Sequence, residues 1–210
     1  MEEKTDTRDR ILKAAMERFI HYGYPKTTIA EIAADCGMSA GNIYRFFPSK
    51  LDIAEAMARK FEGEMLQDLS QIARQTNVSA RRRVSMFFEH IMRRTYEMLD
   101  EKPKVVELAE VLSSERPAHA NVNLASQRVH LVQILDDGVS SGEFAPGDNL
   151  FRAEMIQSAL MKFTYPQLFS HLTLQKLERE FAGVTALILD GLNAREPASD
   201  TVILGDVKSA

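Results

Sequence analysis

A short run of residues, from Ser39 to Arg45, has a composition suited to contact with nucleic acid. The run opens with three small residues: Ser39, Ala40 and Gly41. Asn42 follows, and an asparagine amide can form two hydrogen bonds with the edge of an adenine. The hydroxyl of Tyr44 suits a phosphate oxygen, whereas the guanidinium of Arg45 can read a guanine or hold a phosphate. The pattern predicts contact with double-stranded DNA, with the small residues letting the backbone approach closely.

Flanking residues extend this candidate surface. Lys50 adds positive charge near a helix start, and Thr27 and Thr28 can anchor a phosphate on the other side. The predicted DNA-binding residues are Thr27, Thr28, Ser39, Ala40, Gly41, Asn42, Tyr44, Arg45 and Lys50. Each also has a structural interpretation, because threonine and serine cap helices in many proteins and isolated asparagine or arginine is commonly solvated surface.

Two short helices joined by a glycine turn are expected to position these residues. Gly37 occupies the turn, where a positive φ is least costly for a residue without Cβ. Thr28 and Glu31 have the spacing of a capping box, and Ser39 is placed to cap the next helix. The spacing therefore predicts a helix-turn-helix within residues 29–47.

The rest of the chain also reads as helix, with no convincing strand pattern, so the fold class is all-α with about nine helices. A first helix is expected from Asp6 or Thr7 to Tyr22, closed by Gly23. A long helix follows from about residue 50 to 74. Further helices are expected over Ala80–Leu99, Pro103–Ser113, Pro117–Val139, Asp148–Ser170 and Thr173–Asn193.

The N-terminal residues resemble one known family closely. The shared pattern is Gly23-Tyr24-x-x-Thr27-Thr28-Ile29-x-x-Ile32-Ala33-x-x-x-Gly37-x-Ser39-x-Gly41-x-Ile43-Tyr44-x-x-Phe47-x-Ser49-Lys50. It resembles the N-terminal domain of TetR-family transcriptional regulators over roughly residues 7 to 55. The resemblance implies that Tyr44 and Lys50 bind phosphate and that Thr28 caps a helix. Many relatives differ at Asn42, Arg45 and Phe46, so we expect the choice of operator to lie there.

The same resemblance implies an all-helical homodimer that represses transcription and leaves a pseudo-palindromic operator when a small-molecule effector binds. We expect three segments along the chain. Residues 1–50 would form the DNA-binding domain and residues 51–194 a ligand-binding and dimerisation domain, whereas residues 195–210, which include Pro197, Ser199, Gly205 and Ser209, are predicted to be a disordered tail.

Composition excludes several other classes of protein. The chain has 210 residues and a net charge of −4, but residues 1–50 carry 8 basic against 7 acidic residues, so the acidic excess lies elsewhere. The single Cys36 excludes an internal disulfide, and neither it nor the five histidines have metal-site spacing. We expect no cofactor and no metal. Neither a signal peptide nor a membrane span is indicated, which predicts a cytoplasmic protein.

The last two long helices are expected to form the dimer interface. Apolar residues recur at steps of three and four from residue 174, as in helices that pack against one another. The predicted interface residues are Ile156, Ala159, Leu160, Leu177, Phe181, Val184 and Ile188. The alternative is that this seam packs inside a single chain.

Methionine and aromatic residues in the middle helices indicate an adaptable apolar pocket for a hydrophobic or aromatic effector. The candidate ligand-binding residues are Phe87, Phe88, Ile91, Met92, Tyr96, Met155 and Phe163. Methionine and aromatic residues at helical spacing are also typical of an apolar core that binds no ligand. A basic cluster, Arg81, Arg82, Arg83, Arg93 and Arg94, is interpreted as partners for acidic residues and not as a second nucleic-acid surface.

The sequence disfavours two functions other than a DNA-binding regulator. An enzyme carrying a helix-turn-helix is disfavoured, because the sequence has no nucleophile elbow, phosphate-cradling glycine loop or zinc-protease motif. A structural module that no longer reads DNA is disfavoured by the presence of Gly37, Gly41, Tyr44 and Lys50.

Overall fold

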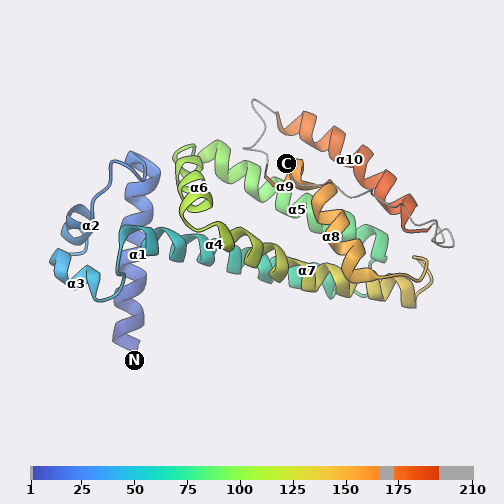
Figure 1. Cartoon of the computed structure of the whole chain (residues 1–210), viewed down its shortest axis with the longest axis horizontal. Coiled ribbons are helices and arrows are strands. Elements are labelled where there is room, and N and C mark those ends of the chain that lie inside the picture. Colours follow the sequence, from blue (N-terminus) through green and yellow to red (C-terminus); the bar gives the residue numbers. More distant parts are fainter. Residues whose placement is uncertain (1, 166–172, 194–210) are drawn as a thin grey trace, which may run out of the picture.

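A computed structural model describes residues 2–165 and 173–193, and within those ranges it contains ten α-helices and no strand (Figure 1). The all-α prediction is confirmed. The helices are α1 (Glu2–Tyr22), α2 (Ile29–Asp35), α3 (Ala40–Tyr44), α4 (Lys50–Ala73), α5 (Ala80–Glu101), α6 (Lys104–Glu115), α7 (Pro117–Ser140), α8 (Asn149–Ala159), α9 (Met161–Thr164) and α10 (Leu174–Gly191).

Two predicted helices differ from the structure. The first begins at Glu2 and not at Asp6 or Thr7. The helix expected from residue 148 is interrupted at Leu160, where ψ is 8° and the chain continues as the short helix α9. Neither glycine nor proline marks this break. Residues 166–170 of that predicted helix, and the predicted tail 195–210, lie outside the described residues.

The molecule has two apolar cores. The first, the head core, combines side chains of the head (residues 2–49) with side chains from the start of α4 and two leucines of α6. The second lies in the body (residues 50–165 and 173–193). Each large apolar side chain buried in a core stabilises the fold by about 1.5–3 kcal/mol. The helix α4 contributes to both, with Ile53 and Met57 in the first core and Met65 and Leu69 in the second.

Helix α6 joins the head although it follows α5 in the chain. Its Leu108 and Leu112 are both 7% exposed and complete the head core against α1 and α4. Figure 1 shows α6 at the junction, above the line of α4. The head is therefore held by α6 as well as by α4.

In the body, α4, α5 and α7 pack together and α8, α9 and α10 cover them. Gly138 lets α7 approach closely, because a Cβ at this position would lie 2.2 Å from Phe144 and 2.9 Å from Ala80. The buried Arg83 donates hydrogen bonds to the carbonyl of Ala73 (2.6 Å) and to Asp137 (2.7 Å). These contacts tie the end of α4 and the end of α7 to the start of α5.

Candidate nucleic-acid interface

Local capping places the two short helices of the head. The hydroxyl oxygen of Thr28 accepts a hydrogen bond from the Glu31 amide (3.3 Å), and a Glu31 carboxylate oxygen accepts one from the Thr28 amide (2.8 Å). The Ser39 hydroxyl oxygen accepts one from the Asn42 amide (3.3 Å). The capping box and the Ser39 cap are confirmed. The Glu31 pKa is lowered, mainly because the hydrogen bonds from Thr28 favour the ionised carboxylate.

The turn between α2 and α3 depends on Gly37. Its φ is +62°, and the amide that follows it, of Met38, donates to the carbonyl of Ala33 at 2.8 Å. A side chain at this φ costs about 1 kcal/mol or more, so glycine is the favoured residue.

The face of α3 that points away from the core carries the predicted base-reading and phosphate-binding groups. Asn42 and Arg45 are exposed, and Tyr44 is 52% exposed, which is unusual for an aromatic residue. Beneath them, Ile43 is fully buried and Phe47 is 2% exposed. A rigid apolar anchor thus presents three polar side chains on one short helix.

The predicted DNA-binding residues differ in exposure. Six are exposed: Thr28, Ser39, Gly41, Asn42, Tyr44 and Arg45. Ala40 and Lys50 are half-buried. Thr27 is 1% exposed and its hydroxyl donates to the carbonyl of Gly23 (2.9 Å), so its side chain is not presented to a ligand. That hydrogen bond instead secures the loop before α2.

Lys50 binds the protein's own backbone. Its Nζ donates to the carbonyls of Tyr24 and Thr27, both at 2.8 Å, and lies 4.2 Å from the centre of the Tyr24 ring. Burial lowers the Lys50 pKa because it disfavours the charged form. Lys50 therefore clamps the loop that carries α2 to the start of α4, an interaction that the sequence pattern did not indicate.

Three arginines of α1 that were not singled out in the sequence also hold the helix-turn-helix. Arg18 pairs with Asp35 and Glu31, Arg10 donates to the carbonyl of Cys36 (2.9 Å), and Arg8 lies 4.7 Å above the ring of Phe47. Their roles depend on contacts with distant residues, so no local signal marks them. In the described residues, no acidic partner is seen for the guanidinium of Arg45.

A network of polar contacts connects the first half of α4 to the start of α7. Arg116, between α6 and α7, contacts Asp52 (3.4 Å) and Glu55 (3.3 Å) of α4. His119 of α7 lies 2.9 Å from Glu62 and 3.7 Å from Glu55. These contacts hold the first half of α4, the helix that follows the helix-turn-helix in the chain, against the start of α7.

The predicted effector residues fall into two groups. Phe87, Phe88, Ile91, Met92 and Phe163 are 0–4% exposed and meet in the body core, with Tyr96 packed against them. Met155 does not join them, because it is 46% exposed on the outer face of α8. The structure brings the first group together as a packed apolar centre.

The predicted dimer residues are also divided. Ile156, Leu160, Leu177 and Phe181 are 0–6% exposed within one chain, so this part of the seam packs inside the body, as the alternative interpretation had it. Val184 and Ile188 are half-buried, and Ala159 is exposed. Periodicity found an apolar face correctly but could not show that the chain's own α5 and α9 cover it.

The basic cluster of α5 is paired with acidic residues, as interpreted from the sequence. Arg81 contacts Asp190, Arg82 contacts Glu89 and Arg83 contacts Asp137. The remaining pairs are Arg93 with Glu89 and Glu178, and Arg94 with Glu64 and Asp68.

No helix of the described ranges has the length and apolarity needed to cross a membrane. The same ranges hold no cluster of potential metal ligands.

Two family models match the chain. Residues 11–57 match the model described as bacterial regulatory proteins, tetR family, and residues 80–185 match the tetracyclin repressor-like C-terminal domain. The regulator TtgW of Pseudomonas putida is 38% identical over 55 residues, which are 26% of this chain and 41% of TtgW. The repressor KstR2 of Mycolicibacterium smegmatis is 27% identical over 142 residues, 66% of this chain and 68% of KstR2.

Solved structures share the fold. FadR of Thermus thermophilus, a TetR-family repressor solved with lauroyl-CoA, has a TM-score of 0.66 at 18% identity and covers 91% of this chain and 98% of its own. FadR of Bacillus subtilis, solved with stearoyl-CoA, has a TM-score of 0.60 at 19% identity, covering 87% and 97%. Regulators of this family bind DNA operators and small-molecule effectors, typically as dimers. The chain belongs to the TetR family and is a helix-turn-helix transcriptional regulator.

Proposed function

We propose that this protein binds a pseudo-palindromic operator as a homodimer, represses transcription from it and leaves it when an effector binds the body. The observation that carries the proposal is the exposed polar face of α3, with Asn42, Tyr44 and Arg45 held on buried Ile43 and Phe47. A helix of this kind can enter the major groove, where base edges are distinguishable. The protein acts by binding and not by catalysis, and its work on DNA places it in the cytoplasm.

We assign DNA reading to residues 1–50 and both effector binding and dimerisation to residues 51–194. Asn42 and Arg45 read bases, whereas Tyr44 and the amide end of α2 at Thr28 hold phosphates. Lys50 supports this surface by clamping the loop before α2. Its remaining N–H can still point to a phosphate.

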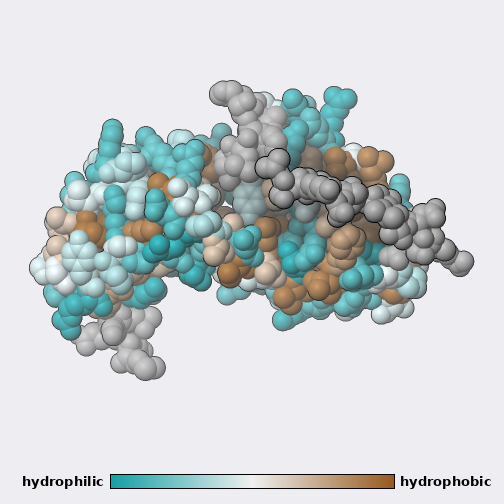
Figure 2. All heavy atoms as spheres, in the orientation of Figure 1, coloured by the Kyte–Doolittle hydropathy of each residue, from teal (hydrophilic) through white to brown (hydrophobic). Residues whose placement is uncertain are grey.

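The outer faces of α8 and α10 are our candidate dimer interface. Phe151 and Met155 of α8 are 55% and 46% exposed, and Leu187 of α10 is 76% exposed. Small exposed residues accompany them, namely Ala159, Ala182, Gly183 and Ala186. Figure 2 shows apolar surface over α8. Apolar residues exposed on both α8 and α10 favour an isologous contact with a second copy, which would place two recognition helices on one operator.

A coenzyme A thioester is the effector class we favour. Two FadR proteins with this fold were solved with lauroyl-CoA and stearoyl-CoA. The body core of this chain, centred on Phe87, Phe88 and Met92, is apolar, and methionine and aromatic side chains can repack around an acyl chain. Entry of such a chain would displace α4 or α7, and α4 passes that movement to the head.

One experiment tests both parts of the proposal. Fluorescence anisotropy of labelled duplexes from the gene's upstream region should show salt-sensitive, saturable binding that unlabelled random DNA does not compete away. Lauroyl-CoA should then release the duplex, whereas free dodecanoate should release it less well. If no duplex is preferred over random DNA, the regulator proposal is wrong. If binding is specific but lauroyl-CoA has no effect, only the effector class is wrong.

A further inference from the structure

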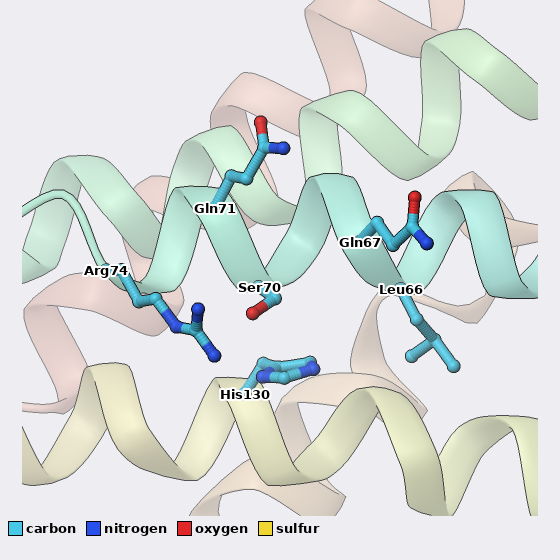
Figure 3. Close-up of a pocket in the computed structure, with 6 residues that line it drawn as sticks. All are labelled: Leu66, Gln67, Ser70, Gln71, Arg74 and His130. Carbon is cyan, nitrogen blue, oxygen red and sulfur yellow. The ribbon is translucent and has the colours of Figure 1, made fainter.

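A groove of about 400 Å³ lies between α4 and α7, away from the DNA-binding surface. Its lining residues are Leu66, Gln67, Ser70, Gln71, Arg74 and His130. Figure 3 shows Leu66, Ser70 and Arg74 projecting from one side of α4 toward α7, and His130 projecting from α7 toward them. The size is within the range of small-molecule sites. We call it the α4–α7 groove.

The charge in this groove is entirely positive. Arg74 is its one formal charge at neutral pH, and no carboxylate lines it. Several arginines of the body are paired with acids, for example Arg83 with Asp137 and Arg128 with Glu154, whereas the described residues show no acidic partner for Arg74. The Arg74 side chain is exposed, so its guanidinium is available to an anion that enters the groove.

The polar groups beside Arg74 are also open to a ligand. Ser70, Gln67 and Gln71 make no side-chain hydrogen bond with another described residue, and neither does His130. Burial and the charge of Arg74 together lower the His130 pKa, so the ring is uncharged at neutral pH. In Figure 3 the Ser70 hydroxyl and the His130 ring lie in the same space as the Arg74 guanidinium, whereas the Gln71 amide points away from α7. A hydroxyl and an imidazole N–H beside a guanidinium are donors that suit phosphate oxygens.

A second, smaller hollow continues from the groove toward the head and shares Leu66 with it. Its ionisable side chains already have partners in the protein, because Arg59 pairs with Glu55 and a Glu62 carboxylate oxygen lies 2.9 Å from the His119 ring. An anion is therefore favoured at the Arg74 end. Behind that end lies the apolar core, since Leu69 and Leu131, the sequence neighbours of Ser70 and His130, are fully buried.

We propose that the α4–α7 groove binds the phosphate groups of a coenzyme A thioester, with Arg74 as the main cationic contact. This assignment rests on the proposed effector class. It places the charged end of the effector in a groove at the surface and its acyl chain within reach of the body core. Because the groove is formed by α4 and α7, an occupant contacts both helices and sets their separation.

Calorimetric titration of the full-length protein with coenzyme A, which lacks an acyl chain, tests the groove directly. Arg74→Gln should weaken coenzyme A binding by about tenfold, the usual effect of losing a hydrogen bond to a charged group, and Arg74→Glu should weaken it further. Arg82→Gln is the matched control, because Arg82 is an arginine with 61% side-chain exposure on α5, outside the groove. Unfolding midpoints verify that all variants fold.

Equal affinity of wild type and Arg74→Gln for coenzyme A would overturn the assignment. Inorganic phosphate that binds as tightly as coenzyme A would also overturn it, in favour of a site for free phosphate. If coenzyme A binding depends on Arg74 but lauroyl-CoA does not release the operator, the groove still binds coenzyme A phosphates and the proposed effector class is wrong. If lauroyl-CoA releases the operator equally well from wild type and from Arg74→Gln, the effector class is supported and the assignment of the α4–α7 groove is rejected.

Discussion

Lys50 shows how one side chain can support the DNA-binding head through the protein's own backbone. Its ammonium group replaces two hydrogen bonds to water with two to the carbonyls of Tyr24 and Thr27. Those carbonyls belong to the loop that enters α2, so the clamp sets where α2 begins. A lysine matched to a phosphate-binding position by sequence pattern therefore has a structural role as well.

Replacement of Lys50 by methionine should reduce the free energy of unfolding by about 2 kcal/mol, because two carbonyls lose a charged donor. Urea denaturation followed by circular dichroism measures this. Lys26→Met is the control, since Lys26 is exposed and should leave the midpoint unchanged. Unchanged stability of Lys50→Met with reduced operator affinity would mean that Lys50 acts on phosphate alone.

Asn42 and Tyr44 should separate base reading from phosphate binding. Asn42→Ala should relax the preference at one or two operator positions, by about 1–3 kcal/mol of discrimination. Tyr44→Phe removes only a hydroxyl and should weaken binding to all duplexes alike. Selection from randomised operators, followed by affinity measurement, distinguishes these effects, and the opposite pattern would contradict our division of roles.

At the scale of helices, α4 and α7 are the elements on which the body depends. Their contact includes the α4–α7 groove, the network of polar contacts at Arg116 and His119, and the buried pair Leu69 and Leu131. Helix α4 also begins at the Lys50 clamp. A change in the spacing of α4 and α7 thus reaches the head through a single continuous helix.

This packing should make stability depend on pH through His130. Its folded-state pKa lies below the ordinary value of 6.5, because of burial first and the charge of Arg74 second. As the pH falls below 6.5, the unfolded chain takes up a proton more readily than the folded one, so stability is lost. His130→Gln should reduce this loss between about pH 7 and 5.5, as measured by urea midpoints across that range.

Arg74→Gln provides an independent measure of the same effect. It removes the second cause of the shift but leaves burial, so it should reduce the pH dependence less than His130→Gln does. Identical pH dependence in wild type and both variants would show that His130 does not titrate differently in the two states.

At the scale of the whole molecule, a single chain leaves apolar surface uncovered. Leu187, Phe151 and Met155 are exposed on the last helices, whereas the neighbouring Leu189 and Ile156 are buried. A second copy related by two-fold symmetry would cover these exposed apolar side chains. A two-fold symmetric dimer is also the arrangement that a pseudo-palindromic operator requires.

Leu187→Glu should therefore convert the protein to a monomer and strongly reduce its affinity for the operator, because each chain would then bind a half-site alone. Size-exclusion chromatography with light scattering gives the mass. Val129→Glu is the matched control, since Val129 is 66% exposed on α7, outside the proposed interface. A dimer that persists in the Leu187→Glu variant but is lost in the Val129→Glu variant would move the interface to α7.

Features that depend on residues close together in the chain were predictable. The Thr28–Glu31 capping box, the Ser39 cap and the Gly37 turn each involve residues within a few positions of one another. Their geometry follows from local hydrogen bonding and φ preferences, so a sequence pattern is sufficient. The helix-turn-helix and the all-helical fold class could be predicted because they too depend on residues close together in the chain.

Features that depend on which helix meets which required the folded chain. Apolar periodicity identified the seam of Leu177 and Phe181, but its burial inside one chain depends on where α5 and α9 lie. The Lys50 clamp, the placement of α6 on the head and the α4–α7 groove likewise join residues that are distant in the chain. These contacts depend on which helices pack together, and the same periodic pattern of apolar side chains is compatible with more than one packing partner.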